Sequence, residues 1–322
     1  MKLIIQIPCY NEEETLPQTV ADLPKHIDGI DVIEYLIIND GSSDQTVEVA
    51  IESGIHHVVH FKNNKGLAMG FMAGIDACLR LGADIIVNTD ADNQYCGQDI
   101  EKLVQPVLDG SADIVIGERP IEEIEHFSPL KKRLQWAGSL VVRITSGTSI
   151  ADAPSGFRAY SREAAMRLNV VNEYTYTLET IIQAGMNKTA MATVPIRTNP
   201  ETRESRLIKS MGSYIKRSTA IIIRSFVMYR PLRFFGIIGT VLFLVGFAIG
   251  FRYLVLLVIG NAGSHIQSLI LASLLMMLGV QTIIAGFQSD IIAANRKLLE
   301  DIQYRMRKTE YTVNQRNDTI EH

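Results

Sequence analysis

Cysteine is scarce in this chain, and basic residues are not in excess. The 322 residues include three cysteines, Cys9, Cys78 and Cys96. An odd number without metal-type spacing excludes a disulfide framework and indicates a reducing compartment. The 31 Lys and Arg residues stand against 35 Asp and Glu residues, which gives a net charge of -4. This balance argues against a globally basic nucleic-acid-binding protein.

The beginning of the sequence, MKLIIQIPCYNEEE, has only a short apolar stretch. The stretch is too short for a signal peptide, and it runs directly into acidic residues. It therefore predicts a first β-strand, and we expect the N-terminal domain to lie in the cytosol.

Short β-branched runs alternate with helical segments as far as about residue 200. The runs predict strands at residues 3–7, 33–38, 57–61, 84–88 and 113–116. The segments between them predict helices at residues 12–23, 46–52, 66–81 and 98–108. This alternation favours an α/β domain with a mostly parallel sheet. Continuous apolar strands are typical of a sheet that is covered on both faces.

Two long apolar segments follow, at residues 234–259 and 266–287. The first contains one charged residue, Arg252, and the second contains none. Each is long enough to cross a hydrocarbon core of about 30 Å. Lys and Arg residues flank the pair but are absent from the linker at 260–265, so the positive-inside rule predicts a helical hairpin with both ends in the cytosol. The alternative is a pair of buried core helices.

The segment before the first span, residues 213–229, mixes apolar and basic side chains. It predicts either an interfacial amphipathic helix or an ordinary amphipathic helix packed on the α/β domain. We therefore expect a cytosolic α/β domain (1–212), a juxtamembrane segment (213–233), two transmembrane helices (234–288) and a cytosolic C-terminal helix and tail (289–322). Gly246 and Gly250 form a small-xxx-small pattern that could pack helices between protomers.

Three acidic residues follow predicted strands. Asp40 comes after the second strand, and Asp90 and Asp92 come after the fourth. Ligands of open α/β sheets gather outside the carboxyl ends of the strands, so these acids predict one cleft. Alternate carboxylates on a loop suit Mg²⁺ or Mn²⁺, which would bridge to diphosphate oxygens. Chance and helix capping also produce Asp-x-Asp.

Other polar residues at the strand ends have structural alternatives. Asp44 is expected to cap the helix that begins near Thr46, and Asn11 could be only an N-cap. Asp40 has the better claim to a ligand, as an acceptor for a base or ribose group.

Four motifs resemble, in order, those of family 2 glycosyltransferases with the GT-A fold. They are residues 8–13 (PCYNEE), 40–44 (DGSSD), 90–92 (DAD) and 155–158 (SGFR). Within that family the chain is similar to the polyprenyl-phosphate glycosyltransferases, which include dolichyl-phosphate mannose synthases and bacterial undecaprenyl-phosphate glucosyl- and aminoarabinosyl-transferases. The resemblance covers nearly the whole chain, because many bacterial members also carry two C-terminal membrane helices.

The resemblance implies a donor site at the strand ends. It assigns nucleotide-sugar binding to Pro8, Tyr10, Glu12, Asp40, Asp90 and Gln94. It assigns the metal, Mg²⁺ or Mn²⁺, to Asp90, Asp92 and Gln94. It also implies catalytic roles for Asp92, Asp152 and Arg119, and Asp152 could be a base, a metal-side support or a residue that orients Arg158.

The resemblance implies a basic acceptor side. The residues expected to bind the acceptor phosphate are Arg119, Arg133, Ser155, Arg158, Arg203 and Arg206. Guanidinium groups can grip phosphate bidentately, although each arginine could instead be a surface charge. Arg206 stands where lysine is usual in the family, and Arg203 stands where glycine is common, so the geometry of that loop departs from the family pattern.

The expected reaction is inverting transfer of one sugar, from a UDP-hexose, to polyprenyl phosphate at the cytoplasmic membrane. Processive synthases of the family carry a Gln-x-x-Arg-Trp signature, which is missing here because the single Trp136 follows Arg-Leu-Gln. The alternatives are transfer to another lipid acceptor, such as a diacylglycerol, and a catalytically silent scaffold that binds nucleotide-sugar. A homo-oligomer is an open option, and nucleic acid is not an expected partner.

Overall fold

The computed structural model describes residues 1–120, 139, 142–143, 146–148, 150–171, 175–200, 219–220, 223–224, 226–260 and 266–320, with side chains up to Tyr311 in the last helix. These residues form two compact units. The first unit consists of Met1–Ile222 together with Asp301–His322, and the second consists of Ile223–Glu300.

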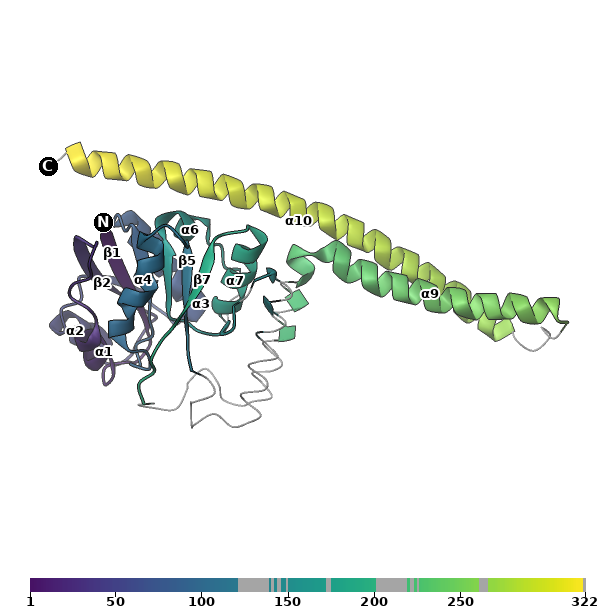
Figure 1. Ribbon diagram of the computed structural model, residues 1–322, viewed down its shortest axis with the longest axis horizontal. Coiled ribbons are helices and arrows are strands. Elements are labelled where there is room, and N and C mark those ends of the chain that lie inside the picture. The colour runs from purple at the N-terminus through teal and green to yellow at the C-terminus, as the bar shows by residue number, and fades with distance from the viewer. Residues whose placement is uncertain are drawn as a thin grey trace. The chain divides into compact units, whose positions relative to one another are not determined.

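The first unit is built on one sheet with the strand order β3-β2-β1-β4-β6-β5-β7. Figure 1 labels β1, β2, β5 and β7 of this sheet and the helices around it. Strand β6 runs antiparallel to β4 and β5, and the other neighbouring pairs are parallel. The strands are β1 (Lys2–Cys9), β2 (Val32–Asn39), β3 (His57–His60), β4 (Ile85–Asn88), β5 (Ile114–Glu118), β6 (Arg158–Ser161) and β7 (Met191–Pro195). The prediction of a mostly parallel α/β sheet is confirmed. Strands β6 and β7 were missed, because both are short and lack a continuous apolar run.

Helices cover the sheet in the first unit. They are α1 (Leu16–Asp22), α2 (Thr46–Glu52), α3 (Leu67–Arg80), α4 (Ile100–Leu108), α6 (Arg162–Arg167) and α7 (Thr177–Met186), with a 3₁₀ turn η1 (Gly97–Asp99). Helix α3 packs on β1 and β2, whereas α4 packs on β4, β5 and β6. Helix α1 begins later than predicted, because Asn11 adopts the left-handed conformation with φ 55° and the N-cap is Thr15. The alternative in which Asn11 is only an N-cap is therefore excluded.

The core of this domain is strand β1 and its neighbours. Leu3, Ile5 and Ile7 are completely buried and pack in one apolar cluster with residues of α1, α4 and β4. Helix α3 approaches the sheet closely at Gly74, where a methyl group would lie 2.3 Å from Oε1 of Gln6. This close packing holds α3 against β1 and β2.

The second unit contains two apolar helices. Helix α9 (Pro231–Val258) and the first part of α10 (Ile266–Ile320) have mean hydropathies of 2.4 and 2.1, and only 6% and 17% of their most apolar stretches are buried. Buried core helices would hide these side chains, so the exposure favours membrane spans. A methyl group at Gly246 would lie 2.8 Å from the carbonyl oxygen of Ala272, so this glycine serves packing of α9 on α10 within one chain.

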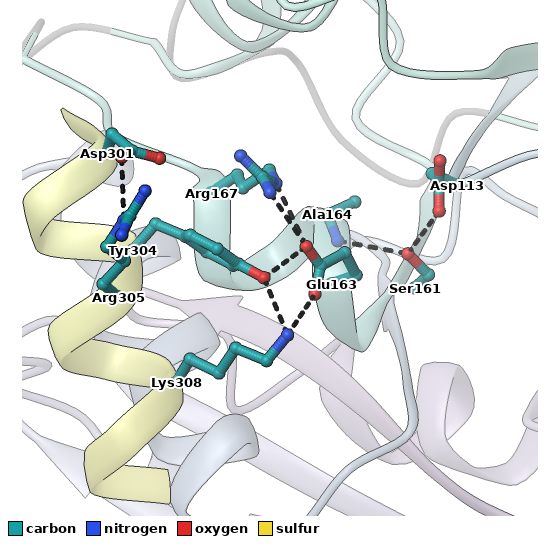
Figure 2. A network of polar contacts seen from close by, with 9 residues as sticks. All are labelled: Asp113, Ser161, Glu163, Ala164, Arg167, Asp301, Tyr304, Arg305 and Lys308. Carbon is teal, nitrogen blue, oxygen red and sulfur yellow. Dashed lines mark hydrogen bonds and ion pairs between the residues drawn. The ribbon is translucent and has the colours of Figure 1, made fainter. Parts of the chain in front are cut away.

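The C-terminal part of α10, residues 301–311, belongs to the first unit and packs on α6 and α3. Figure 2 shows the hydroxyl of Tyr304 donating to the carboxylate of Glu163, which also accepts from Arg167. Nη1 of Arg307 donates to the carbonyl of Leu168 at 2.8 Å, just after α6 ends. The hydroxyl of Tyr311 donates to Asp76 on α3. Residues 301–311 of α10 therefore pack at a specific place on the α/β domain.

Acidic pH is expected to weaken the packing of residues 301–311 on α6. Burial alone would raise the pKa of Glu163, but the Tyr304 hydroxyl and Arg167 outweigh burial and lower that pKa. A lowered pKa means that the stabilisation is present above the ordinary glutamate value and is lost as the pH falls through the lowered one. Hydrogen-exchange protection of residues 301–311, corrected for intrinsic rates, should therefore drop below about pH 4. A Glu163→Gln variant should lose most of this pH dependence, and unchanged wild-type protection at pH 3 would contradict the expectation.

Candidate active site

The loops that follow β1 and β2 form one wall of the site. Oδ1 of Asn11 accepts from the backbone amide of Ser43 at 2.8 Å, and the amide of Asn11 donates to Oγ of Ser42 at 3.0 Å. The amide of Glu12 donates to Oγ1 of Thr46 at 2.8 Å. Asn11, whose backbone is left-handed, bonds the loop after β2 through both its backbone amide and its side-chain oxygen. The structure thus brings together the two motifs that the sequence placed at separate strand ends.

Asp40 organises the loop that precedes α3. Its Oδ1 and Oδ2 accept from the backbone amides of Lys65 and Gly66 at 2.6 and 2.9 Å, and the residue is only 7% exposed. Gly41 has φ 73°, and a methyl group there would lie 2.7 Å from the carbonyl carbon of Asn63. After these two bonds the carboxylate of Asp40 still has lone pairs that could accept from a ligand. The contact of Asp40 with a base or ribose remains a prediction.

The other residues assigned to the nucleotide lie along the same edge. Pro8 pairs with Ile38 in the sheet, and Tyr10 is 42% exposed at the end of β1. Glu12 is nearly buried and accepts from the hydroxyl of Thr15 at 2.8 Å. Asp44 accepts from the amide of Thr46 at 3.2 Å, but the N-cap of α2 is Gln45, so the prediction that Asp44 caps this helix is wrong and its bond lies one residue before the cap.

The loop after β4 carries the carboxylate pair. Oδ1 of Asp92 accepts from the amide of Gln94 at 3.2 Å. Burial, and then the charge of Asp92, raise the pKa of Asp90 to about 7. Two carboxylates that resist simultaneous ionisation form a hard-oxygen site for a divalent cation. The described part of the chain contains no cluster of three or more acidic, His or Cys side chains placed for a metal.

Arg119, directly after β5, is held by Asp152. Its Nε and Nη2 donate to Oδ2 and Oδ1 of Asp152 at 2.7 and 2.9 Å, and its backbone amide donates to the same carboxylate at 3.3 Å. Burial opposes the charge of Arg119, but Asp152 outweighs burial and raises the pKa of Arg119. Asp152 is completely buried. This geometry favours Asp152 as the residue that orients Arg119, and it favours neither a general base nor a partner of Arg158.

Arg158 lies in the core. It is completely buried, and its guanidinium donates to the carbonyls of Ser155, Ala153 and Thr177 at 2.8, 2.8 and 3.0 Å. A fourth bond reaches Oγ1 of Thr180 at 2.7 Å. These bonds shape the 153–158 loop, so the geometry does not favour the predicted contact between Arg158 and the acceptor phosphate. Oγ of Ser155 is buried without a hydrogen-bond partner among the described residues.

Residues 155–158 lie close to Asp90. A methyl group at Gly156 would lie 3.3 Å from Oδ1 of Asp90. The amide of Gly156 donates to the Tyr95 hydroxyl at 3.2 Å, and its carbonyl accepts from Nδ2 of Asn88 at 3.0 Å. The same Nδ2 donates to the Tyr176 hydroxyl at 2.8 Å. Asn88, Tyr95 and Tyr176 escaped the sequence analysis, although the one amide at the end of an otherwise apolar strand was an available signal.

Three of the predicted acceptor residues lie outside the described residues. They are Arg133, Arg203 and Arg206. Their assignment remains a prediction.

The sheet order, with an acidic loop after β4 beside an arginine after β5, defines a GT-A catalytic domain. The chain belongs to Glycosyl transferase family 2, whose profile matches residues 4–168, just over half of the chain. The family resemblance of the four motifs is thereby confirmed.

Named relatives place the chain near enzymes of lipid-linked sugars. It is 33% identical over 217 residues to a UDP-N-acetylglucosamine–dolichyl-phosphate N-acetylglucosaminyltransferase of Methanococcus voltae, covering 60% of this chain and 83% of the relative. It is 32% identical over 176 residues to an undecaprenyl-phosphate mannosyltransferase of Micrococcus luteus, covering 53% and 70%. It is 27% identical over 324 residues to an undecaprenyl-phosphate 4-deoxy-4-formamido-L-arabinose transferase of Sodalis glossinidius, and this match covers 95% of this chain and 92% of the relative.

Solved structures share the fold. Glucosyl-3-phosphoglycerate synthase of Mycobacterium tuberculosis, in complex with Mn²⁺, UDP and phosphoglyceric acid, superimposes with a TM-score of 0.56. The two chains are 20% identical, and the match covers 70% of this chain and 78% of the synthase. At this identity the comparison supports the GT-A fold alone.

Proposed function

We propose that this protein transfers one sugar from a UDP-hexose to polyprenyl phosphate, with inversion of the anomeric configuration. The observation that carries the proposal is the grouping of Asp90, the 155–158 loop and Arg119 at the carboxyl end of β4. A methyl group at Gly156 would lie 3.3 Å from Oδ1 of Asp90. Burial raises the pKa of Asp90, the charge of Asp92 raises it further, and the charge of Arg119 lowers it. Relatives named for transfer to undecaprenyl or dolichyl phosphate support the same acceptor class.

The donor diphosphate would lie between the carboxylate pair and the arginine. A divalent cation, Mg²⁺ or Mn²⁺, held by Asp90 and Asp92 with Gln94 beside them, would neutralise charge on the departing nucleoside diphosphate. Arg119 would face the same charge, and the bidentate bond from Asp152 fixes the direction of its guanidinium. Residues 8–12 and Asp40 would hold the nucleoside at the ends of β1 and β2.

The acceptor needs little activation. A lipid phosphate is already an anion near neutral pH, so the protein has to orient it and screen its charge. In the proposed step a phosphate oxygen attacks the anomeric carbon while the bond from that carbon to the diphosphate breaks, and direct attack of this kind inverts the configuration. Asp152, which is occupied by Arg119, is not needed as a base.

We further propose that the protein is anchored in the cytoplasmic membrane by α9 and the apolar part of α10. Positive charges flank the hairpin on both sides, which supports both ends in the cytosol. This arrangement would keep the catalytic domain on the membrane face where nucleotide-sugars are made and lipid phosphate is accessible.

Purified protein in detergent should convert undecaprenyl phosphate into one glycolipid. The test incubates the protein with a panel of UDP- and GDP-sugars, with Mn²⁺ or Mg²⁺, and identifies the product by mass and its anomeric configuration by NMR. Diacylglycerol and ceramide serve as competing acceptors. Transfer only to those neutral lipids, or no transfer from any donor, would reject the proposed acceptor or the proposed activity, and a product with the donor's configuration would reject inversion.

A further inference from the structure

The segment that follows β7 runs along the acidic loop. Tyr95 and Thr198 form an antiparallel bridge, and the amide of Asn199 donates to the carbonyl of Gln94 at 2.8 Å. The amide of Cys96 donates to the carbonyl of Arg197 at 3.4 Å. Residues 94–96 and 197–199 therefore form an isolated antiparallel β-bridge directly after the carboxylate pair.

The side chain of Asn199 adds a hydrogen bond to the backbone pairs of this β-bridge. Its Nδ2 donates to the carbonyl of Asn93 at 3.0 Å and approaches the carbonyl of Tyr95 at 3.5 Å. Asn93 has φ 55° and is 6% exposed. The left-handed conformation is uncommon for residues other than glycine, and asparagine is among those that tolerate it best. The Asn199 amide restrains this backbone, and it acts on the residue between Asp92 and Gln94.

The segment that carries Asn199 is itself firmly attached. Asp99, which is completely buried, accepts from the backbone amide of Arg197 at 2.6 Å. Nη2 of Arg197 donates to the same carboxylate at 2.8 Å. A shift of residues 197–199 along the acidic loop would break these bonds to Asp99, so they support the register in which Asn199 meets the carbonyl of Asn93.

We infer that Asn199 is a positioning residue of the cation site. It holds the backbone of residues 93–95 in the one conformation that presents Asp92 and Gln94 to a divalent cation and a diphosphate. The inference rests on the proposed function, because it assumes that the acidic loop binds the cation. Residues that orient metal ligands through hydrogen bonds commonly change metal affinity by about 10–100-fold when they are replaced.

The test measures Mn²⁺ binding rather than turnover. Free Mn²⁺ is quantified by electron paramagnetic resonance as it is added to the full-length protein in detergent, with saturating UDP. Asn199→Ala should weaken Mn²⁺ by about 10-fold or more, while the metal-free melting temperature stays close to that of the wild type. Asn199→Asp keeps the shape but replaces the donor by an oxygen, so it should weaken Mn²⁺ at least as much. Asn187→Ala, at an exposed position after α7, is the matched control and should bind normally.

The outcomes separate the inference from the function on which it rests. If wild-type protein binds no Mn²⁺ in the presence of UDP, the proposed metal site fails. If the wild type binds Mn²⁺ and a folded Asn199→Ala or Asn199→Asp variant binds it equally well, the inference about Asn199 is overturned. A loss of affinity in both Asn199 variants but not in Asn187→Ala supports it.

Discussion

Replacing Asp90 by Asn is expected to remove sugar transfer and, at the same time, to stabilise the metal-free protein above neutral pH. Burial and the charge of Asp92 raise the pKa of Asp90 to about 7. The folded state therefore resists ionisation of this carboxyl, and stability falls as the pH rises from the unfolded value of about 4 to about 7. Because Asp90 is partly exposed, we expect a gain on the order of 2 kcal/mol at pH 8, or about 4–8 °C in melting temperature.

Thermal unfolding between pH 4 and 9, without divalent metal, measures this effect beside the transfer assay. The variant should match the wild type near pH 4 and exceed it by a growing margin up to pH 8, with transfer reduced by about 10²–10³-fold or more. Mn²⁺ with UDP should raise the melting temperature of the wild type but not of Asp90→Asn. Asp28→Asn, whose side chain is 93% exposed, should change neither property. A variant that retains transfer, or that is less stable at pH 8, would contradict the role of Asp90.

Replacing Arg119 by Ala is expected to destabilise the catalytic domain strongly. The carboxylate of Asp152 is completely buried and receives two bonds from the guanidinium of Arg119. Removing the arginine leaves a buried charge without its bidentate partner, which typically costs about 3–5 kcal/mol. Arg119→Lys should restore only part of this, because an ammonium group cannot donate as a planar fork.

A double variant separates the structural role from the chemical one. Arg119→Met combined with Asp152→Leu removes both charges, so urea unfolding should show much of the lost stability restored. Transfer should stay low in the double variant, because no guanidinium faces the donor diphosphate. Restored transfer in the double variant would show that Arg119 serves only the fold. A single Arg119→Ala variant with wild-type stability would show that the ion pair is not important for folding.

Local patterns were sufficient for much of the catalytic domain. The five apolar runs became β1 to β5, and the segment at residues 46–52 became α2 with the same bounds. Hydrophobic periodicity is a property of neighbouring residues, so it survives without knowledge of the fold. The strand-end position of Asp40, Asp90 and Asp92 followed from the same patterns, because parallel strands place their carboxyl ends at one edge.

Arg158 and Asp152 show where local patterns were insufficient. Both were expected near the acceptor on the basis of motif order. Arg158 is instead buried in the core. A completely desolvated guanidinium needs several acceptors, and that of Arg158 donates to three backbone carbonyls and a threonine hydroxyl. Asp152 pairs with Arg119, 33 residues away in sequence, because burying a carboxylate is costly unless it is paired and hydrogen-bonded.

By itself, the sequence determined the α/β class, the two apolar helices, the acidic strand ends and the family that they indicate. Only the tertiary structure decided that the antiparallel β6 brings the 155–158 loop against Asp90, that Asn199 braces the acidic loop, and that the end of α10 packs on α6 and α3. The physical reason is the range of the interactions. Apolar patterns and turns act between neighbours in the chain, whereas the partner of a buried charge or amide is chosen by whatever distant segment the fold brings within hydrogen-bonding distance.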